Sequence, residues 1–373
     1  MFGKSIRLAR VFGISIELDL SWFIIFFLVV WSLSRGYFPY YYPDISGERY
    51  ALMGVIAAFL LFLSVLLHEL SHSLIALRNR LPISRITLFI FGGVAQMDEE
   101  PQTPGIEFRV ALAGPICSFV LMGLFHFLST LSAEGGAAFA VFSYASFING
   151  FLAFFNIIPG FPLDGGRLLR SALWHFSGNF KSSTLTASRI GKGFAFFLMA
   201  TGFLQAMGGS TFNGLWFILI GYFLQNAAES SYRQVVIKEF LTGLTVEKVM
   251  NRQVISVTKD IMIDKLVDDF FVTYHRNNFP VLDGERLVGI IRMSDVKKVS
   301  ADERSSVTVA ELMDKDISRH LIRAGDSVEE ILGMMVRDSL GWFAVIEGDN
   351  VIKGILTRSD IMHLLQIKSG LEG

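Results

Sequence analysis

The chain has 373 residues, of which 52% are hydrophobic and 18% charged, and its formal net charge at pH 7 is −1. Average soluble domains contain about 25% charged residues, so this composition indicates a membrane protein. A net charge near zero gives no reason to expect a nucleic acid partner. The single cysteine, Cys117, excludes an internal disulfide framework and is interpreted as a small packing residue in an apolar segment.

The N-terminal segment carries Lys4, Arg7 and Arg10 before the first long apolar stretch, which begins near Leu20. That stretch lacks a small-residue cleavage site, so no cleavable signal peptide is predicted. Residues 15–20 alternate polar and apolar side chains with the period of two that is typical of a β-strand.

Six apolar stretches are candidate membrane-spanning helices, since a span needs about 20 apolar residues. They cover residues 20–35, 51–77, 108–131, 137–158, 190–207 and 212–229, and glycine and polar residues dilute the last two. Lys and Arg concentrate before the first stretch, after the second, and between the fourth and fifth. By the positive-inside rule we expect a cytoplasmic N-terminus, and six spans return the C-terminal part to the cytoplasm.

The second stretch contains His68-Glu69-Leu70-Ser71-His72, and Glu69 is the only charged residue between positions 51 and 77. On a helix, H-E-x-x-H places two imidazoles one turn apart with a carboxylate beside them, which is the arrangement of a zinc site with a general base. The motif also occurs by chance in ordinary helices. A carboxylate inside a membrane span is costly, however, and its presence here favours the metal site.

Residues 83–95 follow this helix and are rich in β-branched and aromatic side chains, which predicts a strand that ends at Gly92-Gly93. One interpretation is a short sheet, formed with residues 15–20, that packs at the membrane surface. The alternative is an exposed edge strand that pairs with an unwound substrate.

A catalytic zinc site needs a third protein ligand, and the best candidate is Asp164 in the segment 156–167. Pro159 and Pro162 are expected to end the fourth span there, and irregular backbone at membrane depth is tolerated only inside protein or along a cavity. Asn156 is a candidate hydrogen-bond donor to the oxyanion of the reaction. The simpler alternatives are a turn residue for Asp164 and a helix–helix contact for Asn156.

The pattern of His68-Glu69-x-x-His72 with Asn156-x-x-Pro159 and Leu163-Asp164-Gly165-Gly166 resembles the site-2 protease family of intramembrane zinc metalloproteases, peptidase family M50. Gly114-Pro115-Ile116-Cys117-Ser118 also matches the G-x-x-x-(N/S/G) motif of that family. The resemblance covers about residues 1–230. It implies one zinc ion held by His68, His72 and Asp164, with Glu69 as catalytic base and Asn156 near the substrate. It also implies substrates that are single-span membrane proteins.

After about residue 235 the chain has the pattern of a soluble α/β domain, and it repeats itself. Residues 244–250 match 307–313, and residues 288–295 match 353–360. A repeat of this length predicts two like modules that pack together. The expected boundaries are a membrane domain at 1–230, a linker at 231–243, and modules at 244–300 and 307–366.

The two modules resemble a pair of cystathionine-β-synthase (CBS) domains. The resemblance implies an adenine nucleotide (ATP, ADP or AMP) whose ribose contacts a T-x-x-D element, and a homodimer formed through the pair. The second module keeps this element as Thr357 and Asp360, whereas the first has Arg292 in the threonine position before Asp295. Arg292 is a candidate phosphate ligand or a salt-bridge partner. Many CBS pairs only dimerise or pack, and fold similarity does not assign a site.

The sequence therefore predicts a polytopic α-helical membrane protein with short membrane-associated β-strands and a cytoplasmic α/β CBS pair, in a bacterial or archaeal plasma membrane. The predicted function is an intramembrane zinc endopeptidase that cleaves the transmembrane segments of single-span proteins and is modulated by adenine nucleotide. Its expected partners are the substrate, the lipid bilayer and a second copy of the chain. The alternative is a non-enzymatic protein, either a CBS-gated transporter or a metal-sensing membrane protein. Transporters usually contain repeated spans, and no clear span repeat is evident.

Overall fold

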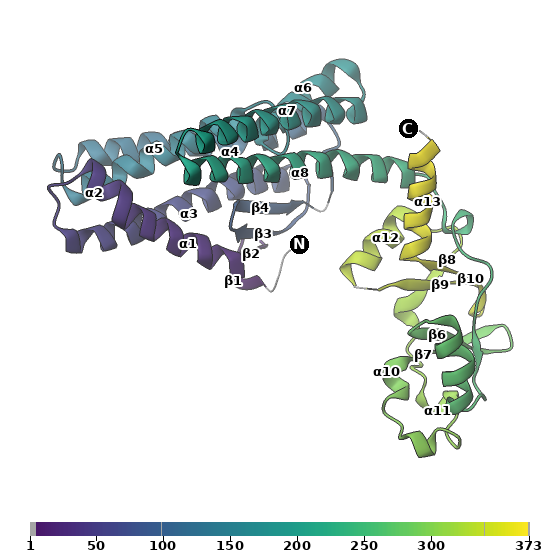
Figure 1. Ribbon diagram of the computed structural model, residues 1–373. Helices are drawn as coiled ribbons and strands as arrows, with labels where there is room; N and C mark the ends of the chain where they lie inside the picture. Colours follow the sequence, from purple (N-terminus) through teal and green to yellow (C-terminus); the bar gives the residue numbers. More distant parts are fainter. Residues whose placement is uncertain (1–4, 98, 339, 372–373) are drawn as a thin grey trace. The chain divides into compact units, whose positions relative to one another are not determined.

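The computed structural model describes residues 5–97, 99–338 and 340–371 (Figure 1). The chain divides into two compact units, Met1–Val235 and Val236–Gly373, and each contains hydrophobic clusters of its own. The change from an apolar to a soluble composition near residue 235 falls at this division.

The first unit is built mainly from helices: α1 (Leu20–Ser32), α2 (Phe38–Tyr41), α3 (Gly47–Arg78), α4 (Pro104–Thr130), α5 (Ala137–Ile157), α6 (Asp164–Ser177), α7 (Phe180–Met207) and α8 (Thr211–Leu241). A π-helical turn, η1 (Leu33–Tyr37), joins α1 to α2. Among the described residues, five helical stretches are long and apolar enough to cross a bilayer, namely Leu20–Tyr41, α3, α4, α5 and α7. They correspond to the first five predicted spans and confirm a multi-pass helical protein.

The sixth predicted span, residues 212–229, lies in α8, which is not among these five helices. Gln225, Asn226 and Glu229 follow directly on its apolar part, and the helix then continues to Leu241. Composition therefore supports five spans, one fewer than predicted. The fifth span begins earlier than residue 190, because the Asn179 side chain accepts a hydrogen bond from Ser182 N (2.9 Å) and caps α7 at Phe180.

A four-stranded sheet completes the first unit, in the order β1 (Ser5–Val11), β2 (Ile14–Asp19), β3 (Ile83–Phe89) and β4 (Gly92–Met97). β2 and β3 are parallel, and the two outer pairs are antiparallel hairpins. β2 confirms the strand predicted at 15–20, whereas β1 was not predicted. The single strand expected over 83–95 is instead the β3–β4 hairpin. Gly92 has a φ of 130°, which favours glycine, and it begins the second strand rather than ending the first.

The sheet packs against the C-terminal half of α3. Ile14, Ile83 and Ile86 of the sheet are buried in one cluster with Ala76 of α3 and Val110 of α4. Ala76 lies one turn after the H-E-x-x-H motif, so the sheet and α4 cover the part of α3 that carries the motif.

The second unit contains a six-stranded sheet in the order β5-β6-β7-β10-β9-β8. Its strands are β5 (Val257–Thr258), β6 (Asn278–Asp283), β7 (Arg286–Arg292), β8 (Leu321–Arg323), β9 (Trp342–Glu347) and β10 (Val351–Thr357). Two antiparallel hairpins, β6–β7 and β9–β10, meet at the centre, and each has a short parallel strand on its outer side. This twofold arrangement is the structural form of the repeat in the sequence.

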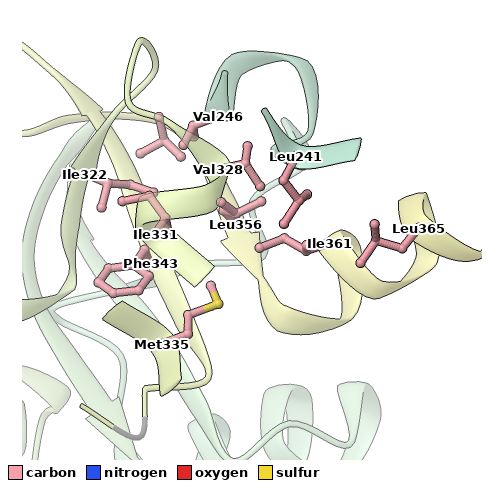
Figure 2. Packing of buried hydrophobic residues seen from close by; sticks show 11 residues of the cluster. Leu241, Val246, Ile322, Val328, Ile331, Met335, Phe343, Leu356, Ile361 and Leu365 are labelled. Atoms are coloured by element: carbon pink, nitrogen blue, oxygen red, sulfur yellow. The ribbon is translucent and has the colours of Figure 1, made fainter. Parts of the chain in front are cut away.

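Each module of the second unit has its own core. Figure 2 shows the second, where Leu241 and Val246 pack with residues of α12 (Val328–Arg337), β9, β10 and α13 (Arg358–Leu371). The first core centres on Phe271, Phe279 and Val281. The α/β architecture predicted for this part of the chain is therefore confirmed.

Candidate active site

His68 and His72 lie four residues apart on one face of α3, and both are buried. Their Nε2 atoms are 3.2 Å apart. Asp164, the first residue of α6, brings its Oδ2 to 3.0 Å from His68 Nε2 and 3.1 Å from His72 Nε2. The structure thus brings together the three residues that the sequence predicted as metal ligands.

Helix α4 orients both imidazoles. Nδ1 of His68 lies 2.9 Å from Ser118 Oγ, and Nδ1 of His72 donates to the carbonyl oxygen of Val110 (2.6 Å). With each Nδ1 engaged, each Nε2 is left facing Asp164, and such hydrogen bonds fix the tautomer and ring orientation of metal-binding histidines. Gly114 lies between these contacts, and a Cβ atom on it would be only 2.5 Å from His68 Nε2. The close approach of α4 to α3 therefore requires glycine at this position.

The donor set fits a zinc ion. Donor atoms of a tetrahedral zinc site at about 2.0–2.1 Å from the metal are roughly 3.3 Å apart, close to the 3.0–3.2 Å separations of the three atoms here. Two imidazoles and one carboxylate leave a fourth position free, as in catalytic sites. The balance of charge also fits, because a divalent cation would neutralise Asp164 and the nearby Glu69.

Glu69 lines a cavity of about 190 Å³ beside the three donors. His72, Asp164 and Arg167 line the same cavity, together with Gly93 and its neighbours in β4. A Cβ atom on Gly93 would lie 2.7 Å from Glu69 Cγ, so β4 passes directly along the Glu69 side chain. The predicted general base and the last strand of the sheet therefore share one cavity with the donor cluster.

The segment before Asp164 is held against α7. α5 ends at Ile157, two residues before Pro159, as the sequence predicted. Phe161 N donates to the carbonyl oxygen of Ala187 (3.2 Å), and a Cβ atom on Gly160 would lie 2.6 Å from Gly191 Cα. This tight packing of the irregular segment between α5 and α6 places Asp164, the first residue of α6, beside the histidines.

Asn156 is placed differently from the other predicted site residues. It is half-buried near the end of α5, and its Nδ2 donates to the carbonyl oxygen of Leu152 in the same helix (3.0 Å). The described residues that line the cavity beside Glu69 do not include Asn156. Its role as an oxyanion donor stays a prediction.

The second unit contains a cavity of about 430 Å³ at the T-x-x-D element of the second module. Thr357 Oγ1 donates to Asp360 Oδ2 (2.6 Å), and both residues line the cavity. Arg276 and Asn278 from the first module line it as well, so a cation and several amides face the same space.

The matching position of the first module is occupied by ion pairs. Asp295 accepts hydrogen bonds from Lys298 Nζ (2.9 Å) and from Arg292 N (3.1 Å). The Arg292 side chain pairs with Asp314 at 2.9 Å. Hydrogen bonds from the Asp316 backbone and from Arg292 hold the pKa of Asp314 below its usual value, so the pair stays ionised. Arg292 is thus a salt-bridge partner, one of the two roles considered for it.

Two features of the site were not predicted, and the first is the pair of contacts from α4 to the histidines. Val110 acts through its carbonyl oxygen, which no side-chain pattern can indicate, whereas Ser118 stood in a recognised motif without an assigned contact. The other is a buried pair of Glu107 and Arg170, of which Arg170 was interpreted only as a charge that sets membrane orientation. The sequence feature that could have indicated this pair is a carboxylate in the first turn of an apolar span.

A bundle of apolar helices that carries H-E-x-x-H in one span, completed by a carboxylate at the start of α6, defines a membrane-embedded metalloprotease. The comparisons with known proteins agree. The model of peptidase family M50 matches residues 56–135 and 122–200, and the CBS domain model matches residues 246–302 and 309–367.

The chain is 34% identical to the protein sll0528 of Synechocystis sp., covering 97% of this chain and 96% of that protein. It is 30% identical to zinc metalloprotease MJ0392 of Methanocaldococcus jannaschii, covering 99% of both chains. A solved site-2 protease of the same archaeon matches 61% of this chain and 95% of that structure, with 31% identity and a TM-score of 0.44. The chain belongs to peptidase family M50, and it is a site-2 type intramembrane zinc metalloprotease with a CBS pair. The non-enzymatic alternative is set aside.

Proposed function

We propose that the protein cleaves the transmembrane segments of single-span membrane proteins, with zinc held by His68, His72 and Asp164 and with Glu69 as general base. The supporting observation is that three donor atoms, two from a membrane-spanning helix and one from the start of α6, lie 3.0–3.2 Å apart beside the cavity that Glu69 lines. Zinc bound there supplies a Lewis acid that lowers the pKa of water and polarises the scissile carbonyl.

The residues of the chain handle the protons and the charge. Glu69 accepts a proton from the attacking water and passes it to the departing amine nitrogen. Asn156 stabilises the oxyanion; its amide has two N–H donors, so one can stay with the carbonyl oxygen of Leu152 while the other reaches the substrate.

Strand β4 is the proposed binding surface for the substrate backbone. It is the outermost strand of its sheet, with β3 on its inner side, and Gly93, Val94 and Ala95 line the cavity beside Glu69. Peptide bonds in a helix are shielded by their own hydrogen bonds, so the substrate must unwind before cleavage. Pairing with β4 satisfies the freed backbone groups and aligns the extended segment with Glu69.

The CBS pair is proposed to bind one adenine nucleotide per chain, at Thr357 and Asp360. The cavity there contains hydroxyl, carboxylate and guanidinium groups, which match a ribose and its phosphates. Asp295 belonged to the predicted nucleotide contacts, but Lys298 and the Arg292 backbone already engage its carboxylate, so the second site is not favoured. A homodimer through the CBS pair completes this proposal.

Helix α8 is the proposed route from nucleotide to active site. It begins in the first unit and ends in the second. Within the first unit, its Phe223 stacks on Phe91 at the turn of the β3–β4 hairpin, with ring centroids 4.3 Å apart and planes 19° from parallel. A nucleotide-dependent shift of α8 would therefore move the hairpin that carries the proposed substrate strand.

The proposed orientation has the N-terminus and the CBS pair in the cytoplasm. Lys and Arg residues beside the spans support it. It requires α8 to cross the membrane as a sixth, more polar span, packed closely on α7 through Gly202, Gly214 and Gly221. Cysteine labelling at the two ends of α8 tests this requirement.

Glu69→Gln is the decisive test of the peptidase mechanism. Co-expressed with candidate single-span substrates, this variant should retain zinc and lose cleavage, whereas Asp164→Asn should lose zinc as well. Cleavage at the wild-type rate by Glu69→Gln would contradict the assignment of the base.

Nucleotide binding is tested by calorimetry with ATP and AMP. Thr357→Val removes one hydrogen bond to the ligand and should weaken binding about tenfold, or roughly 1.4 kcal/mol. Asp295→Asn serves as the matched control and should leave the affinity unchanged. Equal losses in both variants would point to two sites.

A further inference from the structure

Glu107 and Arg170 form a buried ion pair between α4 and α6. Glu107 is 0% exposed and Arg170 4% exposed. Arg170 donates from both Nε and Nη2 to Glu107 Oε1, with the Nε contact at 2.7 Å. The guanidinium also lies over the rings of Phe161 and Phe180, at 4.9 and 4.5 Å from their centroids. Arg170 is therefore held on all sides.

Burying this ion pair between two helices costs desolvation free energy. A buried ion pair is often no more stable than a well-packed apolar pair of the same size. Glu107 Oε2 is also buried without a hydrogen-bond partner among the described residues, which adds a desolvation cost. Its geometry, rather than its stability, distinguishes it, since two N–H donors of the guanidinium fork converge on the single oxygen Oε1 and so fix direction as well as distance.

The pair connects the helix that orients the two imidazoles, α4, to the helix that begins with Asp164, α6. α4 carries Glu107 together with Val110 and Ser118, which orient His72 and His68. α6 carries Arg170 six residues after Asp164, or about 9 Å along the helix. Arg170 thus ties the element that supplies the carboxylate to the element that orients the imidazoles, and its contact with Phe161 fixes the segment on the other side of Asp164.

We propose that Glu107 and Arg170 are positioning residues that set the reach of the Asp164 carboxylate to His68 and His72. They touch none of the three donor atoms and act through the placement of α6. The inference rests on the metal-ligand assignment in the proposed function. It adds that the affinity and coordination geometry of the metal depend on this distant pair.

The test uses the full-length protein in detergent, loaded with Co²⁺ in place of Zn²⁺, because the visible bands of Co²⁺ report its coordination. Arg170→Lys keeps the charge and loses the fork. The double variant Glu107→Leu with Arg170→Met replaces the pair by apolar side chains and is expected to keep the fold. Both should change the Co²⁺ spectrum and weaken Zn²⁺ binding 10- to 100-fold, as loss of outer contacts typically does.

The ion pair of Lys192 with Glu229 (3.0 Å), between α7 and α8, supplies the matched control. Glu229→Gln should leave the Co²⁺ spectrum and the Zn²⁺ affinity unchanged. If the double variant unfolds at the wild-type temperature and has the wild-type spectrum, the inference is overturned. Asp164→Asn distinguishes a failure of this inference from a failure of the proposed function: if it leaves the Co²⁺ spectrum unchanged, the ligand assignment itself is wrong.

Discussion

Replacing Gly114 by alanine should abolish the metal centre while leaving the helix intact. The new Cβ would lie 2.5 Å from His68 Nε2 and closer still to His72 Nε2. Ordinary contact begins at 3.4 Å, so the His68 ring must retreat by about 0.9 Å. Zinc sites keep their metal–ligand distances within about 0.2 Å, so the shift exceeds the tolerance several-fold. We expect zinc affinity to fall by more than the roughly 100-fold that loss of an outer contact causes.

The same helix provides the control for this prediction. Gly123 is also in α4, and a Cβ atom on it would have no neighbour within 4 Å. Alanine is a better helix former than glycine by about 1 kcal/mol, so neither substitution should weaken α4 itself. Zinc content after dialysis against a metal buffer, with cleavage of a single-span substrate, is the measurement. Wild-type zinc affinity in Gly114→Ala would refute the close approach of α4 to the histidines.

Three further predictions concern single contacts. Ser118→Ala removes the partner of His68 Nδ1 and should weaken zinc binding 10- to 100-fold in a chelator competition; an unchanged affinity would show that the contact does not orient the ring. Phe223→Ala removes the stacking on Phe91 and should abolish the response of cleavage to nucleotide, measured with and without AMP, while leaving nucleotide binding intact. Burial lowers the pKa of His320 below its usual 6.5. The unfolded chain therefore takes up the proton first, and the free energy of unfolding of the second unit should fall as the pH drops below about 6.5. Fluorescence of Trp342 during urea unfolding measures this fall, which His320→Phe should flatten.

The sequence could predict the parts of the site whose chemistry is rare in their surroundings. A charged residue in an apolar span and an aspartate after two prolines stand out, and both lie at the donor cluster. Strand β1 did not stand out, because its seven residues mix arginine with apolar side chains and six of them are exposed. The hairpin at 83–97 was hidden because Gly92-Gly93 can end a strand or begin one, and only the pairing of β3 with β4 decides.

Contacts made through α4 could not be predicted for a related reason. Glu107, Val110, Gly114 and Ser118 follow one another at spacings of three and four residues, so they share one face of the helix. In the sequence the part of this face beyond Glu107 looks like an ordinary apolar span, because its functional groups are a carbonyl oxygen, a missing side chain and a small hydroxyl.

One face of α4 therefore contacts both histidines directly and is tied through Arg170 to α6, the helix that begins with Asp164. A small rotation of α4 would displace all of these contacts together, so their effects on zinc binding should not be independent. We compare the triple variant Ser118→Ala, Glu107→Leu, Arg170→Met with Ser118→Ala alone and with the double variant. The loss of zinc-binding free energy in the triple variant should differ from the sum of the two separate losses by at least about 0.5 kcal/mol, in either direction, as for coupled sites. Losses that add within about 0.3 kcal/mol would mean that each contact positions its own ligand. Coupling would identify the packing of α4 on α3 and α6 as the element that sets the geometry of the metal centre.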